Sequence, residues 1–252
     1  MLRVYHLFLG VILLALAPVG IKIMLPKVTP TVEERLIPIS TTTQTSSPLT
    51  TPETTHHSTA ENPWIKILGK THTPKGWEVL PCEGNSPLLC VSSQGKLLGT
   101  VELEVYPVGS YPNFQQNLRD AGILPDSQKK DNPEYQSQLL IALKSWVADV
   151  NGTFLQDREN TSKNQTVFSA YPPQPAAMGK LQGIRYGFVG IKPEGGVEEL
   201  HISHVAFDGE VLYVLTTAFD PPSVAGKFEE LEKLAIFQPY LTAIAADLNL
   251  TR

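Results

Sequence analysis

Apolar and polar residues alternate along several stretches in the first half of the chain, and this alternation predicts β-strands. The clearest stretch is 99–106 (GTVELEVY), in which Val, Leu and Val alternate with Glu, Glu and Tyr. Successive side chains of a strand point to opposite faces of a sheet, so the pattern is typical of a half-buried strand. We expect two further strands at 76–81 (GWEVLP) and 88–93 (LLCVSS).

Two helices are expected in the middle of the chain. Tyr111-Pro112 begins a short helix over 113–121, which Gly122 ends. Asn132-Pro133 begins the longest helix of the chain. Its apolar residues recur at helical spacing and form one stripe: Tyr135, Leu139, Leu143, Trp146 and Val150. Asn151-Gly152 marks the expected end of this helix, or a break in it.

The second half of the chain has mainly strand patterns, at 166–171, 183–191, 198–207 and 210–218. The last three should form an antiparallel meander. Glycine and proline between residues 192 and 196 predict its first hairpin loop, and Asp208-Gly209 predicts a two-residue turn of the primed type. Between the first two of these strands, the segment 172–182 (PPQPAAMGKLQ) is expected to be an exposed, Pro-rich loop.

An amphipathic helix over 223–248 should close the domain, with Ser223 as its N-cap and a kink at Pro239. Runs of strands separated from helices predict the α+β class: one antiparallel β-sheet with helices packed on it. The domain is expected to span 64–252 as a single folded unit.

The residues before this domain have a different composition. The uncharged run Val4–Ile21 would make about 27 Å of helix, close to the thickness of a hydrocarbon core. We expect 1–25 to be a transmembrane anchor that contacts the bilayer through residues 4–25; the alternative is a signal segment cleaved after Ala15-Leu16-Ala17, which Pro18 disfavours. Residues 26–63 are rich in Thr, Ser and Pro and predict a disordered stalk.

Charge and cysteine content restrict the partners and the compartment. The net charge is −5, and no cluster of Lys and Arg indicates nucleic-acid binding. Cys82 and Cys90 are the only cysteines, and they flank a turn-forming sequence between two expected strands. If the hairpin is centred on Ser86, the two face each other, and we expect a disulfide; the alternative is two reduced thiols in a cytosolic domain. Together with the stalk, this pair places the domain outside the cytoplasm, in a periplasm, a thylakoid lumen or at a cell surface.

The sequence contains no motif for catalysis. His201 and His204 are the best candidates for a metal or catalytic pair, but residues three apart on a strand point to opposite faces. We therefore expect one on the surface and one on the buried side. The adjacent carboxylates Glu198-Glu199 and Glu229-Glu230 are expected to be solvated, as are the stalk histidines His56-His57. No nucleophile elbow, zinc-protease motif or phosphate loop occurs. We predict no catalytic residue, no cofactor and no metal site.

Four N-x-S/T sequons, at Asn151, Asn160, Asn164 and Asn249, would be relevant only in a secretory host. They suggest accessible loops around 151–166, a segment whose SKNQT composition is also typical of a linker.

Two segments carry a family resemblance: Gly76-Trp77-Glu78-Val79 at the first strand, and 204–218 (HVAFDGEVLYVLTTA), where an Asp-Gly turn leads into an aromatic strand. With the closing helix, they resemble the PsbP-like superfamily, which includes PsbP, DcrB-like and LpqN-like envelope domains. The likeness covers about residues 64–250; the stalk, the cysteine pair and the lack of a lipobox depart from it. The resemblance implies a PsbP-like α/β/α sandwich that docks on membrane complexes or assists their assembly, without catalysis.

We therefore expect a membrane-tethered accessory domain that binds a membrane protein complex and is not an enzyme. The exposed strand faces and the segment 172–182 are its expected contact surface. Two alternatives remain open: an enzyme, hydrolytic or metal-dependent, whose site is assembled from dispersed residues, and a lone structural envelope protein.

Overall fold

The computed structural model describes residues 61–124, 132–161, 166–221, 223 and 226–250, all within one compact unit. No helix in these ranges is long and apolar enough to cross a membrane. The expected anchor at 1–25 and nearly all of the expected stalk at 26–63 lie outside the described residues, as do His56 and His57.

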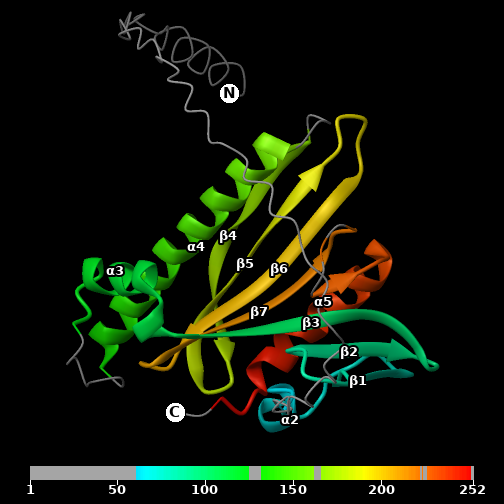
Figure 1. Cartoon of the computed structure of the whole chain (residues 1–252), viewed down its shortest axis with the longest axis horizontal. Coiled ribbons are helices and arrows are strands. Elements are labelled where there is room, and N and C mark those ends of the chain that lie inside the picture. The colour runs from blue at the N-terminus through cyan, green and yellow to red at the C-terminus, as the bar shows by residue number, and fades with distance from the viewer. Residues whose placement is uncertain (1–60, 125–131, 162–165, 222, 224–225, 251–252) are drawn as a thin grey trace, which may run out of the picture. The chain divides into compact units, whose positions relative to one another are not determined.

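The centre of the domain is an eight-stranded sheet with the order β1-β2-β3-β8-β7-β6-β5-β4 (Figure 1). Neighbouring strands are antiparallel except for β7 and the short β8, and β3 also pairs directly with β7. The strands are β1 (Trp77–Pro81), β2 (Leu88–Ser93), β3 (Lys96–Pro107), β4 (Val167–Met178), β5 (Leu181–Ile191), β6 (Val197–Phe207), β7 (Val211–Phe219) and β8 (Lys227–Phe228). The expected α+β class with an antiparallel sheet is confirmed.

Helices cover both faces of the sheet. They are α2 (Trp64–Ile67), the 3-10 turn η1 (Val108–Ser110), α3 (Pro112–Asp120), α4 (Pro133–Thr161) and α5 (Leu231–Ala246). Helices α3 and α4 pack on one face, where the apolar stripe of α4 meets β5, β6 and β7. Helix α5 and Trp64 of α2 pack on the other face (Figure 1). Successive side chains of β7 point to opposite faces, so this strand contributes to two hydrophobic cores. Leu212 and Val214 pack in the core under α3 and α4, and Tyr213 and Leu215 pack in the core under α5.

Three segments differ from expectation. Helix α4 continues through Asn151-Gly152 to Thr161, so the loop expected around 151–166 is helical up to that residue. Helix α5 begins at Leu231, later than the expected 223, because residues 227–228 pair with β3 and β7 as strand β8. The segment 172–182 is not a loop: most of it belongs to the edge strand β4, which turns at Gly179 into β5. Proline is tolerated there because an edge strand has one side free of ladder hydrogen bonds.

The disulfide between Cys82 and Cys90 is present, with a Cα–Cα distance of 5.0 Å. The register of the β1–β2 hairpin differs from the expected one, because Cys90 pairs with Leu80 and the Cys82 N–H donates to the Leu88 carbonyl. The cysteines are therefore diagonal neighbours at the end of the hairpin, in place of a directly opposed pair.

The chain enters the domain next to this hairpin. The Asn62 side-chain amide donates to the carbonyls of Cys82 and Leu88, at 3.0 and 3.1 Å. The Trp64 indole N–H donates to the Pro87 carbonyl at 3.0 Å. Asn62 and Trp64 are both buried, so the first described residues are fastened to the β1–β2 hairpin.

Candidate functional site

Strand β6 points its two histidines to opposite faces of the sheet, as the alternation of a strand requires. His201 faces α4, and His204 faces the α5 side between Ile202 and Ala206. The expectation that one of them lies on the surface is wrong. His204 is fully buried, and the His201 side chain is only 13% exposed.

His201 belongs to a cluster of four charged or titratable side chains, which we call the charge cluster: Arg158, Glu199, His201 and Asp220. Arg158 comes from the last part of α4, and its Nη2 lies 3.2 Å from Glu199 Oε2 and 3.1 Å from Asp220 Oδ2. His201 Nε2 lies 3.1 Å from Glu199 Oε2 and 3.5 Å from Asp220 Oδ2. Both carboxylates are buried, so the expectation that Glu199 is solvated is wrong, whereas Glu229 and Glu230 are exposed as expected.

The cluster shifts the protonation of two of its members. Burial alone would lower the pKa of His201, but the hydrogen bonds to Asp220 and Glu199 outweigh it, and the pKa of His201 is raised. Burial would raise the pKa of Asp220, but the hydrogen bond and charge of His201, together with the Arg158 charge, lower it. Each group therefore favours its charged form in the folded protein.

Aromatic rings cover the cluster. The His201 ring stacks on Phe188 with centroids 4.2 Å apart, and Phe154 of α4 lies 3.9 Å from Phe188. The Arg158 guanidinium lies over the Phe154 ring at 4.6 Å, a cation–π contact. These rings remove water from the ion pairs, which strengthens them and increases the cost of leaving any one charge without a partner.

The charge cluster could in principle hold a metal ion, since one ligand atom from each of Glu199, His201 and Asp220 lies within 4.8 Å of the others. However, the Arg158 guanidinium already contacts both carboxylates and supplies the positive charge that a metal would bring. The four groups neutralise one another, and both carboxylates are engaged by Arg158 and His201. The arrangement fits a structural tie between α4, β6 and β7.

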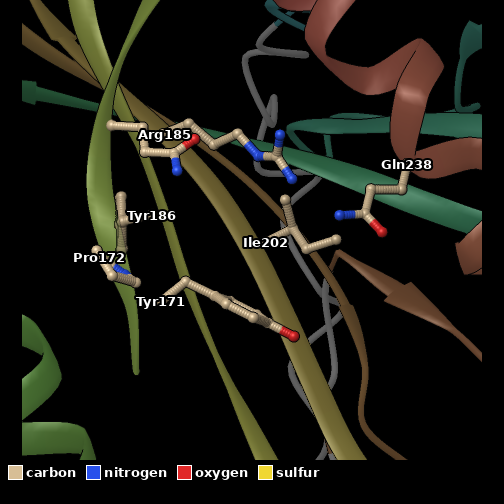
Figure 2. A pocket seen from close by; sticks show the side chains of 7 residues that line it. Tyr171, Pro172, Arg185, Tyr186, Ile202 and Gln238 are labelled. Carbon is tan, nitrogen blue, oxygen red and sulfur yellow. The ribbon is translucent and has the colours of Figure 1, made fainter. Parts of the chain in front are cut away.

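A second candidate is a pocket on the opposite face, between the edge of the sheet and α5, with a volume of about 160 Å³. It is lined by Tyr171, Pro172, Gln174, Arg185, Tyr186, Ile202 and Gln238. Figure 2 shows the Arg185 and Gln238 side chains pointing toward each other past Ile202, with the Tyr171 ring extending toward the same space. None of the lining residues is a carboxylate, a thiol or a histidine, so the pocket is suited to binding and lacks an acid–base pair.

His204 lies beside this pocket. It is the cross-strand partner of Arg185 and shares a face with Ile202, two residues before it. Neither of its ring nitrogens has a hydrogen-bond partner among the described residues. Burial and then the positive charge of Arg185 lower the pKa of His204 to about 4, so the ring is neutral near pH 7.

Sequence reasoning missed Arg158, Asp220, Arg185 and Gln238. For one part of the charge cluster a sequence signal was available, because Glu199 and His201 are two apart on a strand and so share a face. In the structure the β6–β7 ladder, continued past the pair Leu200–Phe219, sets Asp220 opposite Glu199, and the sequence did not indicate this register. Arg158 and Gln238 come from helices, and no local pattern indicates which strand a helical side chain reaches.

No protein-family model matches the chain, and no curated protein matches it. Among solved structures, the chain is similar to the solution structure of cyanobacterial PsbP (CyanoP) from Synechocystis sp. PCC 6803, at 8% sequence identity. The match covers 79% of this chain and 98% of that chain, with a TM-score of 0.36. At this TM-score we draw no conclusion from the match about the fold, the function or the partners of this chain.

Proposed function

We propose that this chain is a membrane-tethered accessory domain outside the cytoplasm, which binds a protein of a membrane complex and turns over no substrate. The observation that carries the proposal is the pocket between β4, β5, β6 and α5. The Arg185 side chain that lines it has no ion-pair or hydrogen-bond partner within the described part of the chain, whereas Arg158 on the other face contacts two carboxylates.

The surroundings of the pocket support a docking role. Strand β4 is an edge strand that pairs only with β5, so half of its backbone groups point away from the sheet. Its apolar residues include Val167, 63% exposed, and Tyr171, 44% exposed. Val167 pairs across the ladder with Ile191, which is 41% exposed. Exposed apolar side chains beside a polar pocket are typical of a protein contact surface.

The proposed compartment and the proposed membrane tether are supported by different observations. A disulfide between the only two cysteines fits an oxidising compartment. The apolar run Val4–Ile21 and the Thr-rich stalk would hold the domain at a membrane, where a tether increases the local concentration of the domain near its target.

Crosslinking in intact membranes of the source organism tests the proposal. The full chain should give a specific crosslinked partner, and Arg185→Gln should reduce the yield, because Arg185 lines the proposed contact surface. Lys144→Gln is the matched control, since Lys144 is an exposed cation on α4, over the opposite face. If the wild type yields no specific partner, the proposed function is wrong.

A metal-dependent enzyme is the second candidate, and the grouping of Glu199, His201 and Asp220 is the observation in its favour. It predicts that the purified full chain turns over a hydrolase or redox substrate when supplied with a divalent metal, and that His201→Gln abolishes the turnover. Turnover that depends on His201 would replace the binding proposal; turnover that persists in His201→Gln would indicate a contaminating enzyme.

A further inference from the structure

The polar groups of the pocket are all donors or neutral amides. Arg185 contributes a guanidinium, Tyr171 a hydroxyl, and Gln174 and Gln238 side-chain amides. Within the described residues, Arg185 has neither an ion pair nor a hydrogen bond to its side chain. Its cross-strand neighbours on this face are Gln174 on β4 and His204 on β6, neither of which is an acid. Here the guanidinium charge has no internal counter-charge, in contrast to Arg158 on the other face.

His204, the buried neighbour of Arg185, supports the inference that the pocket binds an anion. His204 lies directly across from Arg185 and is fully buried, with both ring nitrogens unpartnered. Burial, and then the positive charge of Arg185, lower the pKa of His204, so the ring is neutral and adds no negative charge beside Arg185. The Arg185 guanidinium therefore makes the local field positive. An anion bound at Arg185 would be attracted by this field, and a cation would be repelled.

We propose that this pocket is a carboxylate-binding subsite that takes an aspartate or glutamate side chain of the protein partner. The inference rests on the proposed function and names the chemistry by which the partner is recognised. A guanidinium can donate two parallel hydrogen bonds to a carboxylate, and the Gln238 amide and Tyr171 hydroxyl are additional donors at the same pocket. Ile202 supplies an apolar wall for the methylene groups of the side chain (Figure 2).

The size and position of the pocket favour a side chain over a larger ligand. A volume of about 160 Å³ is below the range of about 300–1,000 Å³ that is usual for small-molecule sites. Tyr171, Pro172 and Gln174 of the pocket lining lie on β4, the free edge of the sheet, along which an extended segment of a partner could lie. One acidic side chain from such a segment would meet Arg185.

The test uses the full chain in detergent micelles, observed by NMR of backbone and side-chain N–H groups. The probe is N-acetyl-glutamate amide, with N-acetyl-glutamine amide as its neutral match and N-acetyl-glycine as a source of a main-chain carboxylate only. The glutamate probe should shift the Arg185 Nε–H and the Gln238 amide signals and bind at least about tenfold more tightly than the glutamine probe. Binding should be lost in Arg185→Met and retained in the control Lys144→Met.

The outcomes separate this subsite from the proposed function. Equal binding of the glutamate and glutamine probes to the wild type would overturn the carboxylate assignment, whether or not the variants fold. Tighter binding of N-acetyl-glycine would overturn the side-chain assignment in favour of a chain terminus. If a partner is crosslinked in membranes but the glutamate probe does not bind, the subsite is wrong and the proposed function stands. If the probe binds at Arg185 but no partner is crosslinked, the subsite stands and the proposed function is wrong.

Discussion

Replacing Arg158 by methionine removes the guanidinium that contacts both buried carboxylates of the charge cluster and leaves them His201 alone. Methionine keeps most of the aliphatic stem and loses the guanidinium that lies over the Phe154 ring, so the change removes the charge, its hydrogen bonds and the cation–π contact. The Glu199 and Asp220 side chains are only 7% and 5% exposed in the structure. In the variant, His201 would be their only remaining cationic partner in the cluster.

The expected loss of stability depends on pH. Removing one partner of a buried ion pair costs about 3–5 kcal/mol, and the Arg158 side chain is 26% exposed, so we reduce the figure to about 2–4 kcal/mol at pH 8. The raised pKa of His201 means that its protonated form stabilises the fold below about pH 6.5 and that this contribution is lost as the pH rises through the folded-state value. At pH 5 the His201 cation compensates one carboxylate, so the loss should be smaller by about 1 kcal/mol or more.

Urea unfolding followed by far-UV circular dichroism, at pH 5 and pH 8, measures both free energies of unfolding. Arg119→Met is the matched control, because Arg119 lies exposed on α3 and, within the described part of the chain, its guanidinium donates hydrogen bonds to Gln116 alone. Its loss should stay below about 0.5 kcal/mol at either pH. A loss for Arg158→Met that equals the control, or that is larger at pH 5 than at pH 8, would refute the account of the cluster as a charge-compensated tie.

Four other changes test separate parts of the structure. Replacing Cys82 and Cys90 by alanine should lower the free energy of unfolding by about 2–3 kcal/mol, because the bond closes a short loop of the unfolded chain; mass spectrometry that finds two free thiols in the native protein would contradict both the bond and the compartment. Gly99→Ala should cost about 1–3 kcal/mol in urea unfolding, since a Cβ there would meet the Phe228 ring at 2.5 Å, whereas Gly109→Ala, whose Cβ would meet nothing within 4 Å, should cost much less. The lowered pKa of His204, about 4, means that its contribution is complete above about pH 6.5 and is lost as the pH falls toward 4; His204→Leu should therefore remove up to about 3 kcal/mol of acid-induced destabilisation between those values. A fragment that starts at Glu61 should unfold cooperatively with nearly the stability of the full chain, because the buried cores are built from residues after it; a molten or aggregated fragment would show that the boundary is wrong.

The strands and their class could be predicted because alternation is a local signal. Strands β1, β2, β3, β5, β6 and β7 lie within a few residues of their expected bounds. Two departures have a tertiary cause. Asn151-Gly152 is exposed or half-buried within α4, and the helix continues because Phe154 and Arg158 beyond it contact Phe188 and the charge cluster. The Pro-rich segment 172–178 is a strand because β5 offers it a ladder, with a bulge between Tyr171 and Gln174 where the two prolines lie.

The charge cluster could not be predicted because the register of the β6–β7 hairpin was two residues off. A two-residue turn at Asp208-Gly209 would pair Phe207 with Glu210, but in the structure Phe207 pairs with Leu212. Asp208 accepts hydrogen bonds from the Glu210 and Val211 N–H groups, so the turn lies one residue later than expected. A shift of two residues keeps every side chain on its face but changes its partner, so faces were predictable and the approach of Asp220 to Glu199 was not.

The attachment of Asn62 and Trp64 to the β1–β2 hairpin has a mechanical consequence. A pulling force applied from the N-terminal side of the domain first loads the hydrogen bonds from these two residues to Cys82, Pro87 and Leu88. Those three acceptors lie at the closed end of the hairpin, where the disulfide joins its two arms. A covalent crosslink does not yield at the forces that separate hydrogen bonds, so the load would pass to β2 and its ladder with β3 without opening the hairpin at that end.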